Sequence, residues 1–153
     1  DGVNPLLRDE ATLSFIRHQA GGVRYVTSVC TGSLLLGAAG LLQDKKATSH
    51  WSAVDYLEKF GATYTSGRDG NLITAGGITS GIDFGLVMIA ELFGQNEAEA
   101  VQLMMEYAPQ PPFNSGTPGD APAAVRALIE PQIAGSRKVR ERIFAEMGDS
   151  DGM

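Results

Sequence analysis

Residues 25–42 read Tyr-Val-Thr-Ser-Val-Cys-Thr-Gly-Ser-Leu-Leu-Leu-Gly-Ala-Ala-Gly-Leu-Leu. The β-branched and aromatic residues of 23–29 predict a strand that is covered on both faces in a parallel sheet. The leucine-rich segment 32–39 follows at once and predicts a helix, which Gly40 ends in a left-handed conformation. Cys30 lies where the strand gives way to the helix. A buried strand that runs directly into a helix is typical of an α/β fold.

The flanking segments continue this alternation. Upstream, Asp9 is expected to cap a helix that stops at Gly21 and Gly22. Downstream, residues 47–49 predict a short strand and residues 51–60 an amphipathic helix that Gly61 closes. The order of elements is therefore βαβα.

The second half of the chain is predicted to contain a hairpin and three helices. Residues 62–65 and 71–74 read as the two strands of an antiparallel hairpin. A capping box, Ser80 with Asp83, opens a helix over 80–93. The remaining predictions are a helix over 96–107, an extended loop over the proline-rich 109–122, and a last helix over 123–147.

Composition and charge limit the classes of function. A chain of 153 residues with 43% hydrophobic and 20% charged residues suits one globular domain. The net charge of -6 disfavours binding to nucleic acid or to anionic membranes. One cysteine and two distant histidines exclude a disulfide framework and predict no metal site. No apolar run reaches the ~18–20 residues of a membrane span, so we expect a soluble, cytoplasmic protein.

Cys30 is the candidate nucleophile. At the turn between a strand and a helix, free backbone amides and the helix dipole stabilise a thiolate relative to a thiol. The alternative is a small inert core residue, because free cysteine is among the most buried residue types. Spacing alone does not decide between the two interpretations, since no local Gly-x-Cys-x-Gly pattern surrounds Cys30.

Other residues are candidates for binding a substrate beside Cys30. The Thr31 hydroxyl could donate a hydrogen bond, and the amides of Thr31 and Gly32 could bind an anion. His50 follows a predicted strand, at the sheet edge where open α/β folds bind ligands. Gly77 and Ile78 occupy a second strand-to-helix crossing, where a missing side chain permits close approach. The alternatives are an ordinary helix start, a structural histidine and a tight turn.

Four basic residues lie close together in the last predicted helix: Arg137, Lys138, Arg140 and Arg142. Acidic residues lie among them, and the chain as a whole is acidic. We interpret this cluster as a solvated helix face and not as a nucleic-acid contact.

Taken together, these motifs resemble the ThiJ/PfpI superfamily. The resemblance rests on residues 25–42, on Ala-Thr-Ser-His-Trp at 47–51 and on Asp-Gly-Asn-Leu-Ile-Thr-Ala-Gly-Gly-Ile-Thr-Ser-Gly-Ile-Asp-Phe at 69–84. Glu-Tyr-Ala-Pro-Gln-Pro-Pro-Phe-Asn at 106–114 is similar to the isocyanide hydratase branch.

This resemblance implies a flavodoxin-like three-layer sandwich of the class I glutamine amidotransferase-like type, a homodimer, and no metal or organic cofactor. It implies that Cys30 adds to the carbon of an isocyanide and that water converts the resulting thioimidate to an N-substituted formamide. Thr31 would then be a hydrogen-bond partner, and Ile78 a close contact of the sulfur. Residues 1–153 are expected to form a single domain without the strand-helix-strand portion, including an acidic residue, that family members carry ahead of the equivalent of Asp1.

Two other functions stay open. AraC-type transcription regulators carry a similar domain as a ligand sensor, with a related Thr-His-Trp segment. A redox-responsive member of the superfamily would use the same reactive cysteine, which peroxide would oxidise.

Overall fold

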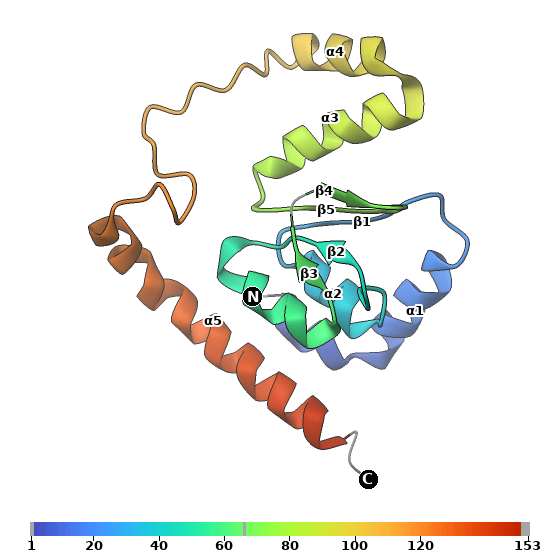
Figure 1. Ribbon diagram of the computed structural model, residues 1–153, viewed down its shortest axis with the longest axis vertical. Helices are drawn as coiled ribbons and strands as arrows, with labels where there is room; N and C mark the ends of the chain where they lie inside the picture. The colour runs from blue at the N-terminus through green and yellow to red at the C-terminus, as the bar shows by residue number, and fades with distance from the viewer. Residues whose placement is uncertain (1, 66, 151–153) are drawn as a thin grey trace.

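The computed structural model describes residues 2–65 and 67–150, with side chains described through residue 147. Figure 1 shows the arrangement of the elements. In chain order they are η1 (Asn4–Arg8), α1 (Glu10–Ala20), β1 (Val26–Val29), α2 (Gly32–Ala38), β2 (Lys46–Ala47), η2 (Trp51–Phe60), β3 (Thr63–Tyr64), β4 (Gly67–Asp69), β5 (Leu72–Ala75), α3 (Ser80–Phe93), α4 (Gln95–Met104) and α5 (Ala123–Ser150).

The main sheet has the strand order β1-β5-β4. β1 and β5 run parallel, with Val26 opposite Leu72 and Val29 opposite Ala75, whereas β4 is antiparallel to β5. β2 and β3 form a second, parallel pair. Helix α3 contacts β5 from one side of the sheet and α2 contacts β1 from the other, which gives three layers (Figure 1). The predicted α/β class and the mostly parallel sheet are confirmed.

The predicted hairpin has a different first strand. Gly67–Asp69 pairs with Leu72–Ala75, and Asp69 lies opposite Leu72, so that only Gly70 and Asn71 form the turn. Gly70 has a φ of +60°, which a two-residue hairpin turn requires. Residues 62–65 instead contribute β3, which pairs parallel to β2. The antiparallel pairing that we predicted between 62–65 and 71–74 was wrong, because β4, which directly precedes the tight turn, occupies that place beside β5.

The strand that is buried in the sheet is β5 and not β1. Leu72, Ile73 and Thr74 are all buried, whereas in β1 Thr27 is exposed and its neighbours are half-buried. β1 begins at Val26, and Val23 is 41% exposed, so the predicted strand over 23–29 was too long and too deeply buried.

Helix ends follow the sequence signals at α1 and η2 but not at α3. The Asp9 carboxylate accepts the Thr12 N–H, as a capping residue does, and Gly61 closes η2 with a φ of +70°. The predicted capping box does not form, because α3 is preceded by Thr79 and the Ser80 hydroxyl donates to the carbonyl oxygen of Gly77 at 2.5 Å.

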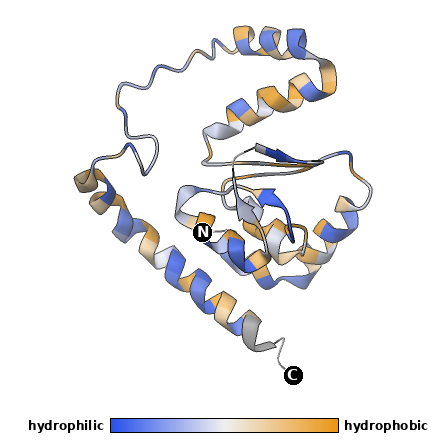
Figure 2. Cartoon of the chain, in the orientation of Figure 1, coloured by the Kyte–Doolittle hydropathy of each residue, from blue (hydrophilic) through white to orange (hydrophobic). Residues whose placement is uncertain are grey.

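The hydrophobic core lies between η1, α2, η2, β5 and α5. Its buried members include Leu7, Leu34, Leu57, Leu72 and Ile143. Hydrophobic and polar residues are interspersed along helix α5 (Figure 2), which contributes Ile143 to the core and packs Phe144 and Met147 against it.

The basic cluster on α5 turns inward at two positions. The side chain of Arg140 is 2% exposed, and its Nε donates to Asn4 Oδ1 at 3.0 Å. Arg137 donates to both carboxylate oxygens of Asp55, at 3.0 and 2.6 Å. Both guanidinium groups lie over the ring of Tyr56. The predicted solvated face was therefore wrong for Arg137 and Arg140, because these side chains dock α5 onto η1 and η2.

Helix α3 is apolar around much of its circumference, yet none of its side chains is buried among the described residues (Figure 2). None of the helices in the described ranges combines the length and the apolar character that crossing a bilayer demands.

Candidate active site

Cys30 occupies a strained backbone position between β1 and α2. Its φ is +59°, in the left-handed region, where a residue with a Cβ atom costs roughly 1–2 kcal/mol. Such strain persists only where surrounding contacts hold the residue in place, and it is concentrated at functional sites. The elbow predicted from the strand-to-helix pattern is therefore present, and its thiol is half-buried and free of any disulfide.

Hydrogen bonds fix both backbone groups of Cys30. Its N–H points at the end of β5, where it donates to the carbonyl oxygens of Ala75 at 3.1 Å and Gly76 at 2.6 Å. Its carbonyl oxygen accepts from the hydroxyls of Ser49 at 3.1 Å and Ser33 at 3.3 Å. Three chain segments thus hold the strained residue.

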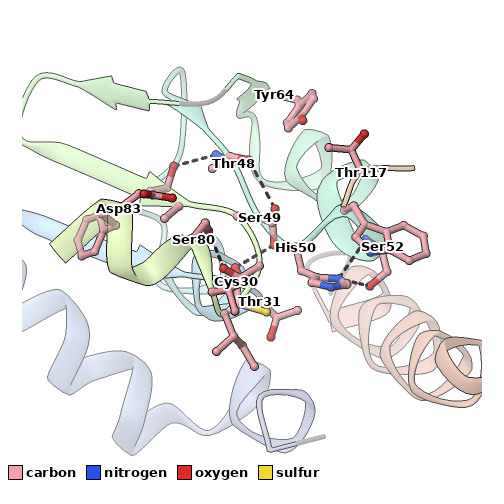
Figure 3. Close-up of a pocket in the computed structure, with 18 of the residues that line it drawn as sticks. Cys30, Thr31, Thr48, Ser49, His50, Ser52, Tyr64, Ser80, Asp83 and Thr117 are labelled. Carbon is pink, nitrogen blue, oxygen red and sulfur yellow. Dashed lines mark hydrogen bonds between the residues drawn. The ribbon is translucent and has the colours of Figure 1, made fainter. Parts of the chain in front are cut away.

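A cleft of about 1350 Å³ opens beside Cys30. Five of the six predicted site residues line it: Cys30, Thr31, His50, Gly77 and Ile78. The sixth, Gly32, is the first residue of α2 and is not part of the cleft's described lining; a Cβ atom there would lie 3.5 Å from Ser28 Cβ. Figure 3 shows Cys30 and Thr31 below the segment that carries Ser49 and His50.

Thr31 and Ile78 both have side chains available to a ligand. Thr31 precedes α2, but its hydroxyl makes no capping hydrogen bond to the helix. The Ile78 side chain is 80% exposed at the cleft. Gly77 lies against His50, where a Cβ atom would be 3.6 Å from His50 Cδ2, an ordinary van der Waals distance, so this packing does not require a glycine.

His50 is held as a neutral imidazole. Its Nδ1 accepts the backbone N–H of Ser52 at 3.3 Å and lies 2.8 Å from the Ser52 hydroxyl, so Nε2 is left to carry the proton. Burial lowers the pKa of His50 below its usual value, and the positive charge of Arg140 lowers it further. Nε2–H is therefore a hydrogen-bond donor at the cleft near neutral pH.

This environment predicts a pH dependence of stability. The unfolded state takes up a proton at His50 as the pH falls through about 6.5, whereas the folded state does so only at lower pH, because its pKa is lowered. Between these two pKa values the unfolded state binds more protons than the folded state, so the free energy of unfolding decreases as the pH is lowered. We expect His50→Asn, whose Oδ1 can accept the same Ser52 N–H, to lose less stability than wild type between pH 7.5 and 5.5. Urea unfolding at both pH values measures this, and equal losses would contradict it.

Sequence reasoning missed several residues of the site. Ser49 and Ser33, which donate to the Cys30 carbonyl, gave no signal beyond the position of Ser49 next to His50. Arg137 and Arg140 reach the cleft from α5, more than a hundred residues after Cys30. Asp83 also lines the cleft and accepts a hydrogen bond from the Tyr107 hydroxyl at 3.1 Å.

The described residues contain no group of three or more His, Cys, Asp or Glu side chains placed to hold a metal ion.

A parallel sheet that presents a strained cysteine at a helix start, beside a cleft, defines a class of α/β proteins with a cysteine elbow. The model of the DJ-1/PfpI family matches residues 2–91, and the chain belongs to that family. This confirms the predicted superfamily.

Known relatives agree with this assignment. The isonitrile hydratase of Pseudomonas putida is 57% identical over 145 residues, which are 93% of this chain and 64% of that protein. A crystal structure of a ThiJ/PfpI family protein from Pseudomonas syringae has a TM-score of 0.88 and 49% identity, covering 94% of this chain and 60% of that one. Drosophila melanogaster DJ-1beta shares the fold, with a TM-score of 0.61, 24% identity and coverage of 71% and 60%. The predicted flavodoxin-like, class I glutamine amidotransferase-like fold is confirmed.

The chain thus spans about two thirds or less of the length of these relatives. Its similarity also extends to a regulator: the HTH-type transcriptional regulator CdhR of Pseudomonas aeruginosa is 38% identical over 76 residues, 46% of this chain and 23% of that protein.

Proposed function

We propose that this protein is an isocyanide hydratase whose nucleophile is Cys30. The observation that carries the proposal is the strained position of Cys30, with a φ of +59°, at a cleft in a chain that is 57% identical to an isonitrile hydratase over 93% of its length. Strain at a half-buried cysteine in a cleft favours a reactive residue over an inert core residue.

The reaction follows from the chemistry of the two groups. The Cys30 thiolate forms a bond to the terminal carbon of R–NC, and that carbon takes a proton from a general acid, which gives the thioimidate R–N=CH–S–Cys30. Water then adds across the C=N bond, with its oxygen on carbon and a proton on nitrogen. The C–S bond breaks, the thiolate leaves, and loss of the hydroxyl proton gives R–NH–CHO. The formamide therefore has the composition of one R–NC and one water molecule, and the thiolate is regenerated.

The other cleft residues are proposed to bind and orient the substrate. The Thr31 hydroxyl is available as a hydrogen-bond donor, since the helix does not use it. The Nε2–H of neutral His50 can donate to the substrate nitrogen when water adds to the C=N bond and negative charge develops on that nitrogen. Gly77 lies beside His50 and, with Ile78, lines the same cleft, and we keep Gly32 as a proposed contributor through its backbone amide.

We further propose that the protein works as a homodimer in the cytoplasm. Exposed hydrophobic side chains on α3 and α4 support a second copy as a partner, among them Phe93, Leu103 and Met104, which are 71%, 80% and 88% exposed. Light scattering of the full-length protein tests this, and a monomeric mass would contradict it.

The proposed activity is tested by mixing the purified full-length protein with an aryl isocyanide in H₂¹⁸O. We expect the N-aryl formamide to form with one ¹⁸O atom. We also expect intact-protein mass spectrometry during turnover to find an adduct that adds the mass of one isocyanide molecule, and proteolytic digestion to place it on the peptide that contains Cys30. Formamide without any adduct at Cys30 would contradict the nucleophilic role, and no formamide would contradict the activity.

A ligand-sensing function is the second candidate. It is favoured by the 38% identity to a transcriptional regulator, but that match covers 46% of this chain, against 93% for the isonitrile hydratase. Sequence-specific DNA binding by the full-length protein, without formamide production, would reverse the order of the two candidates.

A further inference from the structure

Two buried hydroxyls converge on a single backbone carbonyl, that of Cys30. Ser33 and Ser49 are 0% and 3% exposed, so neither hydroxyl can exchange this hydrogen bond for one to bulk water. A carbonyl oxygen with two donors has both of its lone pairs used. The Cys30 carbonyl oxygen thus accepts one hydrogen bond for each of its lone pairs.

The two donors differ in what they restrain. Ser33 lies three residues after Cys30 in the first turn of α2, so its hydrogen bond is local and moves with the helix. Ser49 lies 19 residues away, in the segment between β2 and η2. Its hydroxyl ties the peptide between Cys30 and Thr31 to a different part of the fold (Figure 3).

The segment that carries Ser49 is itself fixed to β5. The backbone N–H of the neighbouring Thr48 donates to Thr74 Oγ1 at 2.8 Å, a buried hydrogen bond. A Cβ atom on Gly76 would lie 3.8 Å from the Ser49 carbonyl oxygen, so the two backbones pass close together. Gly76 in turn accepts the Cys30 N–H at 2.6 Å.

A closed ring of contacts results. It runs from the Cys30 N–H to the carbonyl oxygen of Ala75, along β5 to Thr74, across the hydrogen bond that Thr74 Oγ1 accepts from the Thr48 N–H, and back through the Ser49 hydroxyl to the Cys30 carbonyl. Rotation of Cys30 out of its left-handed conformation would move its N–H and its carbonyl together, and so would break the ring on both sides.

We propose that Ser49 is a positioning residue for Cys30, which holds the strained backbone so that the sulfur faces the cleft. The consequence for turnover rests on the proposed isocyanide hydratase function, but the consequence for thiol reactivity does not. Ser49 also lines the cleft, but its hydroxyl donates to the Cys30 carbonyl, and we propose that it acts through this backbone group.

The test compares Ser49→Ala with wild type in the full-length protein. The first readout is the rate of alkylation by iodoacetamide of the peptide that contains Cys30, measured by mass spectrometry under conditions where circular dichroism shows the protein folded. We expect this rate to fall about fivefold, the change in population of the strained conformer that one ordinary hydrogen bond supports. With an aryl isocyanide, kcat should fall by a similar factor while KM stays within about twofold, because substrate contacts remain. Ser49→Thr, which keeps the hydroxyl, should restore most of both rates.

Ser28→Ala is the matched control. The Ser28 hydroxyl is also buried, two residues before Cys30, but it has no hydrogen-bond partner among the described residues. Its removal should leave alkylation and turnover unchanged. The proposal is overturned if Ser49→Ala is alkylated at the wild-type rate, or if Ser28→Ala loses as much reactivity as Ser49→Ala.

Two further outcomes are informative. If Ser49→Ala does not fold, Thr74→Val loosens the segment that carries Ser49 by removing the acceptor of the Thr48 N–H, and a wild-type alkylation rate there would overturn the proposal. If alkylation slows in Ser49→Ala but no variant makes formamide, the positioning role stands and the proposed function fails.

Discussion

Cys30→Ala is expected to lower kcat/KM for hydration of an aryl isocyanide by at least about 1000-fold, as the loss of a covalent nucleophile does in other enzymes. Without sulfur there is no thioimidate, and water alone must attack the isocyanide carbon. Alanine has a Cβ atom, as cysteine does, so it keeps the same cost at a φ of +59°. The loss of activity would therefore report the sulfur and not a relaxed backbone. The rate of formamide formation, followed by liquid chromatography, measures the effect.

The control for this prediction is the stability of the variant. Cys30 is half-buried, so removing its sulfur, which leaves the methyl group of alanine, should shift the free energy of unfolding by no more than about 1 kcal/mol. If Cys30→Ala makes formamide as fast as wild type, Cys30 is not the nucleophile. Cys30→Ser should also be inactive, because a serine hydroxyl in the same place is not ionised.

Arg140→Ala is expected to lower the free energy of unfolding by about 3 kcal/mol, because it removes the packing of a large buried side chain together with a buried hydrogen bond. The guanidinium is 2% exposed, donates to Asn4 Oδ1 at 3.0 Å and lies over the Tyr56 ring at 5.3 Å. Truncation would leave the buried Asn4 oxygen without this donor and a cavity between α5 and η2. Urea unfolding followed by circular dichroism measures the change.

Lys138→Ala is the matched control on the same helix. Lys138 is exposed, and its removal should change the free energy of unfolding by less than about 0.5 kcal/mol. Arg140→Met fills most of the volume without the charge, so it should lose less stability than Arg140→Ala. Equal losses for Lys138→Ala and Arg140→Ala would show that the buried network contributes nothing.

Local sequence signals predicted the parts of the fold that local physics determines. The Asp9 cap, the left-handed Gly61 and the strand-to-helix crossing at Cys30 all depend on residues within a few positions of each other. Which strands pair with one another is not determined by residues so close together. Whether residues 62–65 pair with β2 or with β5 depends on the tight turn at Gly70, and both pairings satisfy the same β-rich pattern.

The candidate site divides in the same way. Cys30, Thr31 and His50 could be found because each lies at the end of a predicted strand, and such ends meet at one edge of a parallel sheet. Arg137 and Arg140 could not, because a basic cluster has the same sequence pattern whether it faces water or a buried tyrosine. Ser33 and Ser49, the donors to the Cys30 carbonyl, could not be predicted for a related reason. The sequence does not indicate which backbone carbonyl a serine hydroxyl will bind in the folded protein.

The docking of α5 also bears on how the site is made in the cell. Asn4 bonds to Ser136 across 132 positions, and the wall of the cleft that α5 provides is translated long after the cysteine elbow. Closing so long a loop is slow relative to local helix formation. A nascent chain that ends before residue 123 would therefore lack this wall, and the complete cleft forms only after α5 has been translated and has docked.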